Sequence, residues 1–220
     1  MKRLFDLAVG GAGLVLTAPL LAASALAIKL DSPGPVVFRQ VRVGRDKKPI
    51  YTLKLRTMVA DASKLGPQIT SGRDPRITRV GRWLRKTKLD ELPQLWNVVR
   101  GDMSIVGPRP EVPRFVEQYD ARWQALFSVR PGLTDLASVT FRDEEQLLAL
   151  ARDHERAYRH VIMPLKLELA LEGVQRSSLR HDLGVIARTV GALFGLQSNR
   201  HSAVLAEARR RIQHLESGDA

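Results

Sequence analysis

The side chains best suited to chemistry are the neighbouring carboxylates Asp90 and Glu91, in the stretch Lys88-Leu89-Asp90-Glu91-Leu92-Pro93. This pattern predicts that Asp90 is the N-cap of a helix, with Glu91 in the first turn and Pro93 tolerated there. The positive end of a helix dipole favours ionised carboxylates. An ionised carboxylate can attack phosphorus, and a second one can hold Mg²⁺ beside it. Because an Asp-Glu pair at a helix start usually serves only as a cap, its surroundings must decide its role.

Cationic side chains are concentrated around this acidic pair. Guanidinium groups bind phosphate oxygens through two parallel hydrogen bonds, which suits a diphosphate ligand. Arg109 lies in the rigid turn Gly107-Pro108-Arg109-Pro110, where backbone and guanidinium can approach a ligand together. The same reasoning applies more weakly to two pairs on expected strands, Gln40 with Arg42 and Lys54 with Arg56. A solvated basic surface explains most of the other cations near the pair: Arg73, Arg76, Arg79, Arg82, Arg85, Lys86, Lys88 and Arg100.

The chain of 220 residues is strongly basic, with 35 Lys and Arg against 23 Asp and Glu and a net charge of +12. This excess predicts an anionic partner: nucleic acid, anionic lipid or a phosphorylated substrate. Nucleic acid is disfavoured because aromatic residues make up only 5% of the chain, and no stacking platform or nucleic-acid-binding motif accompanies the basic residues. The absence of cysteine excludes disulfides, a thiolate nucleophile and Cys-ligated metal sites.

The N-terminal segment is apolar enough to enter a membrane. Leu7 to Ile28 are 22 residues without a charge, and as a helix they would extend about 33 Å, the thickness of a bilayer's hydrocarbon core. Pro19 is expected to kink such a helix, and the cations Lys2, Arg3 and Lys29 flank both ends. Basic flanks on both sides favour a re-entrant helix that returns to the same face, and a single span stays open. A cleaved signal sequence and a buried core helix are less consistent alternatives.

The rest of the chain predicts a helix-rich α+β fold with a single catalytic domain. Strands are expected at residues 36–38 and 50–53, on either side of a basic loop. A mobile loop is expected at residues 65–74, and a charged tail from Ser198 is expected to form a solvated or membrane-surface helix. Helices are expected where apolar residues recur at helical spacing: 78–86, 90–100, 116–127, 144–158, 164–174 and 183–194. The chain therefore divides into a membrane-inserted helix (1–30), a catalytic domain (31–196) and a charged C-terminal tail (197–220).

The residues from Arg76 to Pro110, RITRVGRWLRKTKLDELPQLWNVVRGDMSIVGPRP, closely resemble the bacterial sugar transferase family, the small monotopic phosphoglycosyl transferases. Further motifs extend the resemblance over roughly Lys2 to Leu193: KRLFD, SPGP, FRQVRVG, KLRTM, RPGLT and the late Asp182-Leu183. The resemblance implies an enzyme that transfers a phosphosugar from a UDP-sugar to polyprenol (undecaprenyl) phosphate and releases UMP, the first membrane step of exopolysaccharide or lipopolysaccharide assembly. It also implies a re-entrant membrane helix broken at Pro19, with the catalytic domain on the cytoplasmic face of the bacterial inner membrane.

The resemblance further implies roles for the site residues. Asp90 would be the nucleophile that forms a phosphosugar–aspartyl intermediate, and Glu91, with Asp90 beside it, would hold the cofactor Mg²⁺. The polyprenol phosphate would then attack the intermediate, which predicts two-step kinetics. Arg85 and Arg109 match family arginines at the site. With the strand residues they make up the expected phosphate- or UDP-binding set: Arg42, Lys54, Arg56, Arg85 and Arg109.

Four positions depart from the family pattern. Ala18 replaces a common serine before the proline, Lys88 replaces a serine before Leu-Asp-Glu, and Asp135 replaces a glycine. Ala170 is at a position where some relatives have an acidic residue, so a secondary acidic role is either absent from this chain or is carried by Glu168. None of these departures touches the acidic pair, so the implied reaction class stands and the sugar preference stays open.

Two alternatives from other functional classes remain on the residues alone. One is a non-catalytic basic membrane-surface protein that binds anionic lipid or a partner, and the other is a basic protein secreted after signal cleavage. The favoured interpretation predicts a UDP-sugar donor, a polyprenol phosphate acceptor and membrane lipid as partners, and it is compatible with a homodimer.

Overall fold

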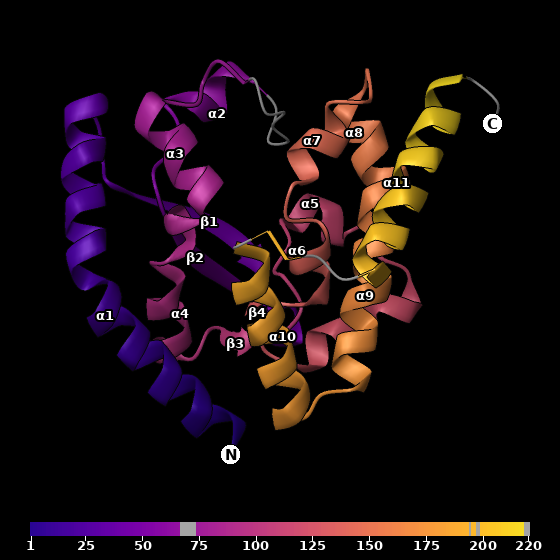
Figure 1. The fold of residues 1–220 in the computed structure, drawn as a ribbon, viewed down its shortest axis with the longest axis horizontal. Coiled ribbons are helices and arrows are strands. Elements are labelled where there is room, and N and C mark those ends of the chain that lie inside the picture. The colour runs from indigo at the N-terminus through magenta and orange to yellow at the C-terminus, as the bar shows by residue number, and fades with distance from the viewer. Residues whose placement is uncertain (67–73, 194, 197–198, 218–220) are drawn as a thin grey trace.

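The computed structural model describes residues 1–66, 74–193, 195–196 and 199–217. Among these residues helices predominate, and the strands form two small two-stranded sheets. Figure 1 shows the long N-terminal helix at one side, the strands in the middle and the C-terminal helices on the other side. The predicted helix-rich α+β class is thus confirmed, whereas most of the predicted loop at residues 65–74 lies outside the described residues.

Helix α1 (Lys2–Asp31) contains the whole apolar segment. By length and composition it could cross a membrane, and the rest of the chain buries little of its apolar stretch. The helix continues through Pro19, and its ribbon changes direction partway along (Figure 1). Thr17 Oγ1 donates to Gly13 O (2.7 Å), a bond to the preceding turn that favours bending. The predicted break at Pro19 is therefore not confirmed, because α1 continues through this residue as one helix.

The N-terminal end of α1 is tied to the rest of the domain by charged groups. Arg3 donates from two Nη atoms to carbonyl oxygens in the last turn of α4 (Gln94–Arg100), at 2.6 and 2.7 Å. Asp6 is buried and accepts hydrogen bonds from Ser104 Oγ (2.9 Å) and Ile105 N (3.0 Å). A buried carboxylate that accepts two such bonds fixes this end of the helix firmly.

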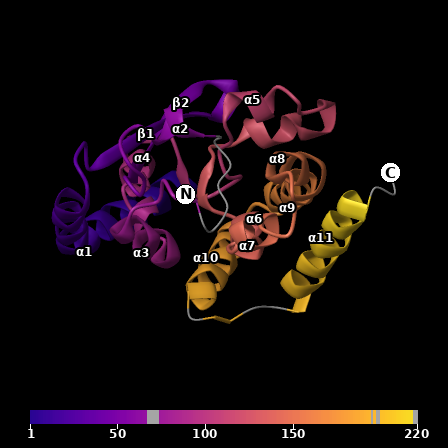
Figure 2. The same ribbon diagram turned by 90° about the horizontal axis from the view of Figure 1, so that it is seen from above.

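The C-terminal end of α1 is attached to the same folded unit. Asp31 Oδ2 accepts a hydrogen bond from Val80 N (3.0 Å), and Ile28 is buried in a small cluster with Leu55 and Leu84. Figure 2 shows α1 lying along the helices that follow the first sheet. Both ends of the apolar helix therefore contact one folded body.

Strands β1 (Val37–Val43) and β2 (Pro49–Leu55) form an antiparallel hairpin around the 3-10 turn Arg45–Lys47. The two predicted strands are confirmed and are longer than expected. After the short helix α2 (Ala62–Leu65), a second sheet pairs β3 (Ser104–Val106) with β4 (Gly132–Thr134) in parallel. A Cβ atom at Gly132 would lie 2.1 Å from Gly107 N, so this close approach requires glycine. These strands are not predictable from the sequence, because three residues show no measurable alternation.

Helix α3 (Arg79–Thr87) begins after Thr78, whose Oγ1 accepts a hydrogen bond from Gly81 N (3.0 Å), in agreement with the predicted helix at 78–86. The acidic pair follows in the 3-10 turn Leu89–Glu91, and α4 starts only at Gln94. The prediction that Asp90 caps this helix is therefore wrong. Lys88 has a left-handed backbone (φ 61°) that turns the chain sharply before the pair, and the tight turn separates Asp90 from α4.

The C-terminal half consists of short helices around one large apolar core. It contains a 3-10 segment at Ala121–Ser128 and a π-helical turn at Tyr158–Ile162. The predicted helices at 164–174 and 183–194 are confirmed within the described residues. The helices are α5 (Pro113–Val116), α6 (Leu136–Thr140), α7 (Glu144–Leu148), α8 (His154–Ala157), α9 (Met163–Gln175), α10 (Leu179–Leu193) and α11 (Asn199–Ser217).

Two predictions for this half are wrong. Residues 116–127 do not form one helix, because Asp120 accepts a hydrogen bond from Arg122 N and starts a 3-10 segment there. Residues 144–158 are split into α7 and α8, and the side chain of Asp153 caps the second of these helices. The charged tail forms the helix α11 over its described part, and although most of this helix is exposed, it buries Ala208 and Ile212 against α6 and the π-helical turn.

Candidate active site

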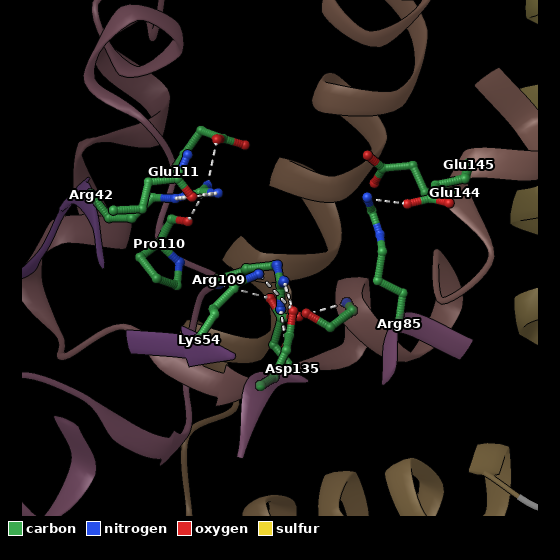
Figure 3. A network of polar contacts seen from close by, with 12 residues as sticks. Arg42, Lys54, Arg85, Arg109, Pro110, Glu111, Asp135, Glu144 and Glu145 are labelled. Carbon is green, nitrogen blue, oxygen red and sulfur yellow. Dashed lines mark hydrogen bonds and ion pairs between the residues drawn. The ribbon is translucent and has the colours of Figure 1, made fainter. Parts of the chain in front are cut away.

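A cavity of about 600 Å³ lies between the side of the domain that carries α3, α4 and β2 and the side that carries α6, α7 and α10. In Figure 3, Lys54 and Arg109 converge at the centre, Arg85 meets Glu145 on one side, and Arg42 meets Glu111 on the other. The fold thus brings together side chains that are distant in the sequence. The cavity is lined by six of the predicted site residues: Arg42, Lys54, Arg85, Asp90, Glu91 and Arg109.

Glu91 is the centre of this cluster. Its Oε1 accepts a hydrogen bond from Lys54 Nζ (2.9 Å). Arg109 spans both carboxylate oxygens, with Nη1 donating to Oε2 (3.1 Å) and Nη2 donating to Oε1. Burial would raise the pKa of Glu91, but Arg109 and Lys54 outweigh it and hold that pKa well below its ordinary value. Glu91 is therefore an ionised carboxylate whose two oxygens are both occupied by cations of the protein.

Asp90 has the opposite environment. Its side chain is only 8% exposed, and its Oδ1 has no hydrogen-bond partner among the described residues. Burial and the Glu91 carboxylate raise the pKa of Asp90, against the opposing charges of Lys54, Lys88 and Arg85. A buried polar atom without a partner costs free energy, so its retention calls for an explanation. Asp90 lines the cavity, so a ligand bound there is in a position to supply the missing partner.

The two carboxylates fit a Mg²⁺ ion that is shared with a diphosphate. Such an ion is held by one or two carboxylates together with substrate phosphates and water. The unpartnered Oδ1 of Asp90 can serve as one ligand, and Glu91 can serve as a second by releasing one of its cations. Within the described part of the chain, no cluster of three or more His, Cys, Asp or Glu is suited to a metal. These residues therefore do not build a metal site from protein ligands alone.

The other predicted cations at the cavity have protein partners. Arg85 reaches across to Glu145 of α7 and so joins the two sides of the cavity. Arg42 lies near the far end, where it donates to Glu111 Oε1 (2.9 Å) and to Gln40 Oε1 (2.7 Å). Both arginines therefore line the site, as expected for residues that bind phosphate or the UDP part of a donor.

Arg56 lies elsewhere. It is buried at the end of β2, where its guanidinium donates to the carbonyl oxygens of Ser32 (2.8 Å) and Pro33. It does not line the cavity that contains Lys54. Strand β2 ends at Leu55, so the alternation that would keep residues 54 and 56 on one face no longer applies. Arg56 thus stabilises the turn that follows α1.

The opposite wall of the cavity carries a polar group that was not predicted from the sequence. Glu111 is bound by Arg42 and accepts a hydrogen bond from Tyr158 Oη, while Lys166 Nζ donates to Glu144 Oε2 (2.7 Å). Burial would raise the pKa of Glu111, but Arg42 and Lys166 outweigh it and the pKa is lowered. Glu111 directly follows the Gly-Pro-Arg-Pro turn, and this position in the sequence could have identified it as a site residue. Only the tertiary fold brings Tyr158, Lys166 and Glu144 to the cavity.

Two departures from the family pattern now have a structural setting. Asp135 caps α6, since its Oδ1 accepts from Ser138 N (2.6 Å), and its Oδ2 accepts from Arg109 N (3.4 Å). Ala170 is buried in the core, and Glu168 is exposed. Glu168 therefore does not supply a carboxylate to this cavity.

Comparison with known proteins identifies the family of this chain. A family model described as bacterial sugar transferase matches residues 1–195. The chain is 42% identical over 198 residues to the UDP-glucose:undecaprenyl-phosphate glucose-1-phosphate transferase of Caulobacter vibrioides, covering 87% of this chain and 69% of that protein. It is 40% identical over 195 residues to the Escherichia coli K12 protein of the same name, covering 86% of this chain and 39% of that protein.

A third relative is the UDP-N-acetylgalactosamine-undecaprenyl-phosphate N-acetylgalactosaminephosphotransferase of Aeromonas hydrophila, 42% identical over 142 residues. That match covers 63% of this chain and 34% of the relative, so the chain spans much less than the full length of two of these three proteins. The family match extends over nearly the whole chain, from α1 to the end of α10. The chain therefore belongs to the bacterial sugar transferase family and is an enzyme of the transferase class.

Proposed function

We propose that this protein transfers a phosphosugar from a UDP-sugar to undecaprenyl phosphate, in two steps through a covalent Asp90 intermediate, with release of UMP. The observation that carries the proposal is the buried, unpartnered Oδ1 of Asp90 beside a Glu91 that is fixed by Lys54 and Arg109. The donor and acceptor classes are taken from the names of the relatives, which include UDP-glucose and UDP-N-acetylgalactosamine. The reaction would be the first membrane step of glycan assembly.

In the first step, an ionised Asp90 oxygen attacks the phosphorus that bears the sugar. The bond from this phosphorus to the bridging oxygen of the diphosphate breaks, and that oxygen leaves as part of UMP. Lys54 and Arg109 support this step because their charges already converge beside Asp90, where charge develops on the phosphate oxygens. Mg²⁺ held by Asp90 and Glu91 would supply further neutralisation of the diphosphate charge.

In the second step, a phosphate oxygen of undecaprenyl phosphate attacks the same phosphorus. The bond to Asp90 breaks, the carboxylate is regenerated, and the lipid carries the new sugar diphosphate. Arg85 and Arg42 line the same cavity on opposite sides of the acidic pair, so each incoming phosphate would meet a cation. The two steps use one nucleophile and one cavity, which predicts ping-pong kinetics.

We also propose that α1 enters the bacterial inner membrane and returns to its cytoplasmic face. Thirty helical residues extend about 45 Å, so a straight span would place their ends on opposite sides of the bilayer. Here Arg3 and Asp6 at one end, and Ile28 and Asp31 at the other, all contact one folded body. These contacts support a re-entrant helix. The buried bonds of Asp6 also argue against a cleaved signal sequence.

The reaction is tested by incubating the detergent- or nanodisc-embedded protein with a panel of UDP-sugars, Mg²⁺ and undecaprenyl phosphate, and measuring UMP. The wild-type protein is expected to release UMP with at least one donor, and Asp90→Asn is expected to abolish this release and the sugar-phosphate adduct seen by intact mass. Asp120→Asn, which alters an exposed cap far from the cavity, is the matched control. No turnover with any donor, together with salt-sensitive vesicle binding, would favour the non-catalytic surface protein.

The topology is tested by labelling single cysteines, which the chain permits because it has none. Leu4→Cys and Leu30→Cys place a thiol at an exposed position near each end of α1. In inside-out and right-side-out vesicles, both thiols should react with a membrane-impermeant maleimide in the same preparation only. Labelling in opposite preparations would overturn the re-entrant arrangement.

A further inference from the structure

Helices α1 and α10 form two walls of the catalytic cavity. Their N-terminal ends are joined by an ion pair between Lys2 and Asp182, and the two helices diverge from that point (Figure 1). Val9 and Gly13 of α1 and Val190 of α10 all line the cavity that contains the acidic pair. The space between the two helices is therefore continuous with the active site.

The cavity has two chemically different regions. One is the charged cluster around Glu91 described above. The other is apolar. It is formed by Val9 of α1, by Leu95 of α4 and Leu92 just before that helix, and by Ile186 and Val190 of α10. A Cβ atom at Gly13 would lie 3.2 Å from Leu95 Cδ1, so a larger residue there would push α1 outward from α4 or fill the space.

Apolar side chains continue along α1 beyond the cavity. From Val9 to Gly13, the two α1 residues that line the cavity, the rise along the helix is about 6 Å. Beyond Gly13, α1 exposes further large apolar side chains, among them Leu16 and Leu20. A hydrocarbon chain that lies in the cavity and along α1 would therefore contact apolar side chains in both places.

We infer that the gap between α1 and α10 is the binding channel for the isoprenoid chain of the lipid acceptor, which enters sideways from the membrane and brings its phosphate to Asp90. This inference rests on the proposed function. It fits a ligand with one anionic end and one long apolar tail, because cations and an apolar wall adjoin in one cavity. The transmembrane candidate α1 then serves as one wall of an acceptor site as well as an anchor.

The experiment alters the α10 wall at Val190, which is 48% exposed and therefore tolerant of substitution. Val190→Glu places a charge on the wall, and Val190→Trp fills it without a charge. The matched control is Leu183→Glu on the same helix, since Leu183 is 52% exposed and does not line the cavity. All proteins are first shown to float with the same vesicles.

Two rates are measured for each protein in nanodiscs. The donor half-reaction is followed as exchange of labelled UMP into UDP-sugar without acceptor, and the full reaction is followed with undecaprenyl phosphate. For both Val190 variants we expect the ratio of the full rate to the exchange rate to fall by about tenfold or more, because an apolar chain binds poorly to a charged or filled wall. With geranyl phosphate, whose tail is short, the fall should be much smaller.

Leu183→Glu should keep the wild-type ratio. An equal fall in Leu183→Glu would show that charge on the membrane surface, not the channel, controls the acceptor, and would overturn the inference. Wild-type ratios in both Val190→Glu and Val190→Trp would overturn it as well. Absence of UMP exchange in the wild-type protein would instead contradict the proposed two-step reaction, so the two failures are distinguishable.

Discussion

Replacing Arg109 with lysine tests whether the two-pronged contact at Glu91 is needed for the reaction. Arg109 reaches both carboxylate oxygens, at 3.1 Å to Oε2 and with a second contact to Oε1. Lysine keeps the charge but cannot span both oxygens from one planar group. A charge-assisted hydrogen bond contributes about 1.5–3 kcal/mol, so the loss of one should lower kcat/KM for UMP release by roughly tenfold to hundredfold.

The assay is the initial rate of UMP release at several donor concentrations, so that kcat and KM are obtained separately. Arg114→Lys is the control, because Arg114 donates one hydrogen bond to Glu155 (3.2 Å), lies over the Phe115 ring and does not itself line the cavity. If Arg109→Lys stays within twofold of the wild-type protein in both kcat and KM, the two-pronged contact is not part of the mechanism. A loss confined to thermal stability would lead to the same conclusion.

Three further predictions concern stability and pH. Asp6→Ala leaves Ser104 Oγ and Ile105 N without their buried acceptor, so the free energy of unfolding should fall by about 2–4 kcal/mol. Calorimetry in detergent would detect this loss as a lower Tm. An unchanged Tm would contradict the anchoring of α1 by Asp6. Ile212→Ala should also cost about 2–4 kcal/mol because Ile212 is fully buried, and a solvated α11 would show no change. Burial and Glu91 raise the pKa of Asp90. Protonation of Asp90 should therefore slow UMP release as the pH falls, with a midpoint above 3.8, the ordinary pKa of aspartate. A pH–rate profile whose acid limb lies at or below 3.8 would refute Asp90 as the nucleophile with a raised pKa.

Local sequence patterns determined several features of this protein correctly. The long uncharged run predicted the apolar helix, because twenty or more consecutive apolar residues are typical of a helix that can span the hydrocarbon core of a membrane. The hairpin followed from two short strand-like segments joined by a basic loop, and the helices α3, α9 and α10 followed from helical spacing, patterns that act over a few residues. The Asp90-Glu91 pair and Arg109 were identified because each lies within a short and distinctive motif.

Tertiary structure decided how these residues are used. Glu91 is held by Lys54 and Arg109, which come from β2 and from the turn after β3, and no local pattern predicts which cation pairs with which carboxylate. The unpartnered oxygen of Asp90 depends on the turn that begins at Lys88, whose left-handed backbone has no strong sequence signal. Arg56 does not line the cavity, because β2 ends one residue before it and the alternation of the strand stops there.

Burial was the other property that only the fold supplied. The apolar positions of α11 were visible in the sequence, but whether they faced water depended on a surface formed by α6 and the π-helical turn. The same holds for the gap between α1 and α10, whose walls are separated by more than 150 residues of chain. Short-range patterns specify elements because backbone hydrogen bonds and capping are local, whereas pairing and burial depend on contacts between residues far apart in sequence.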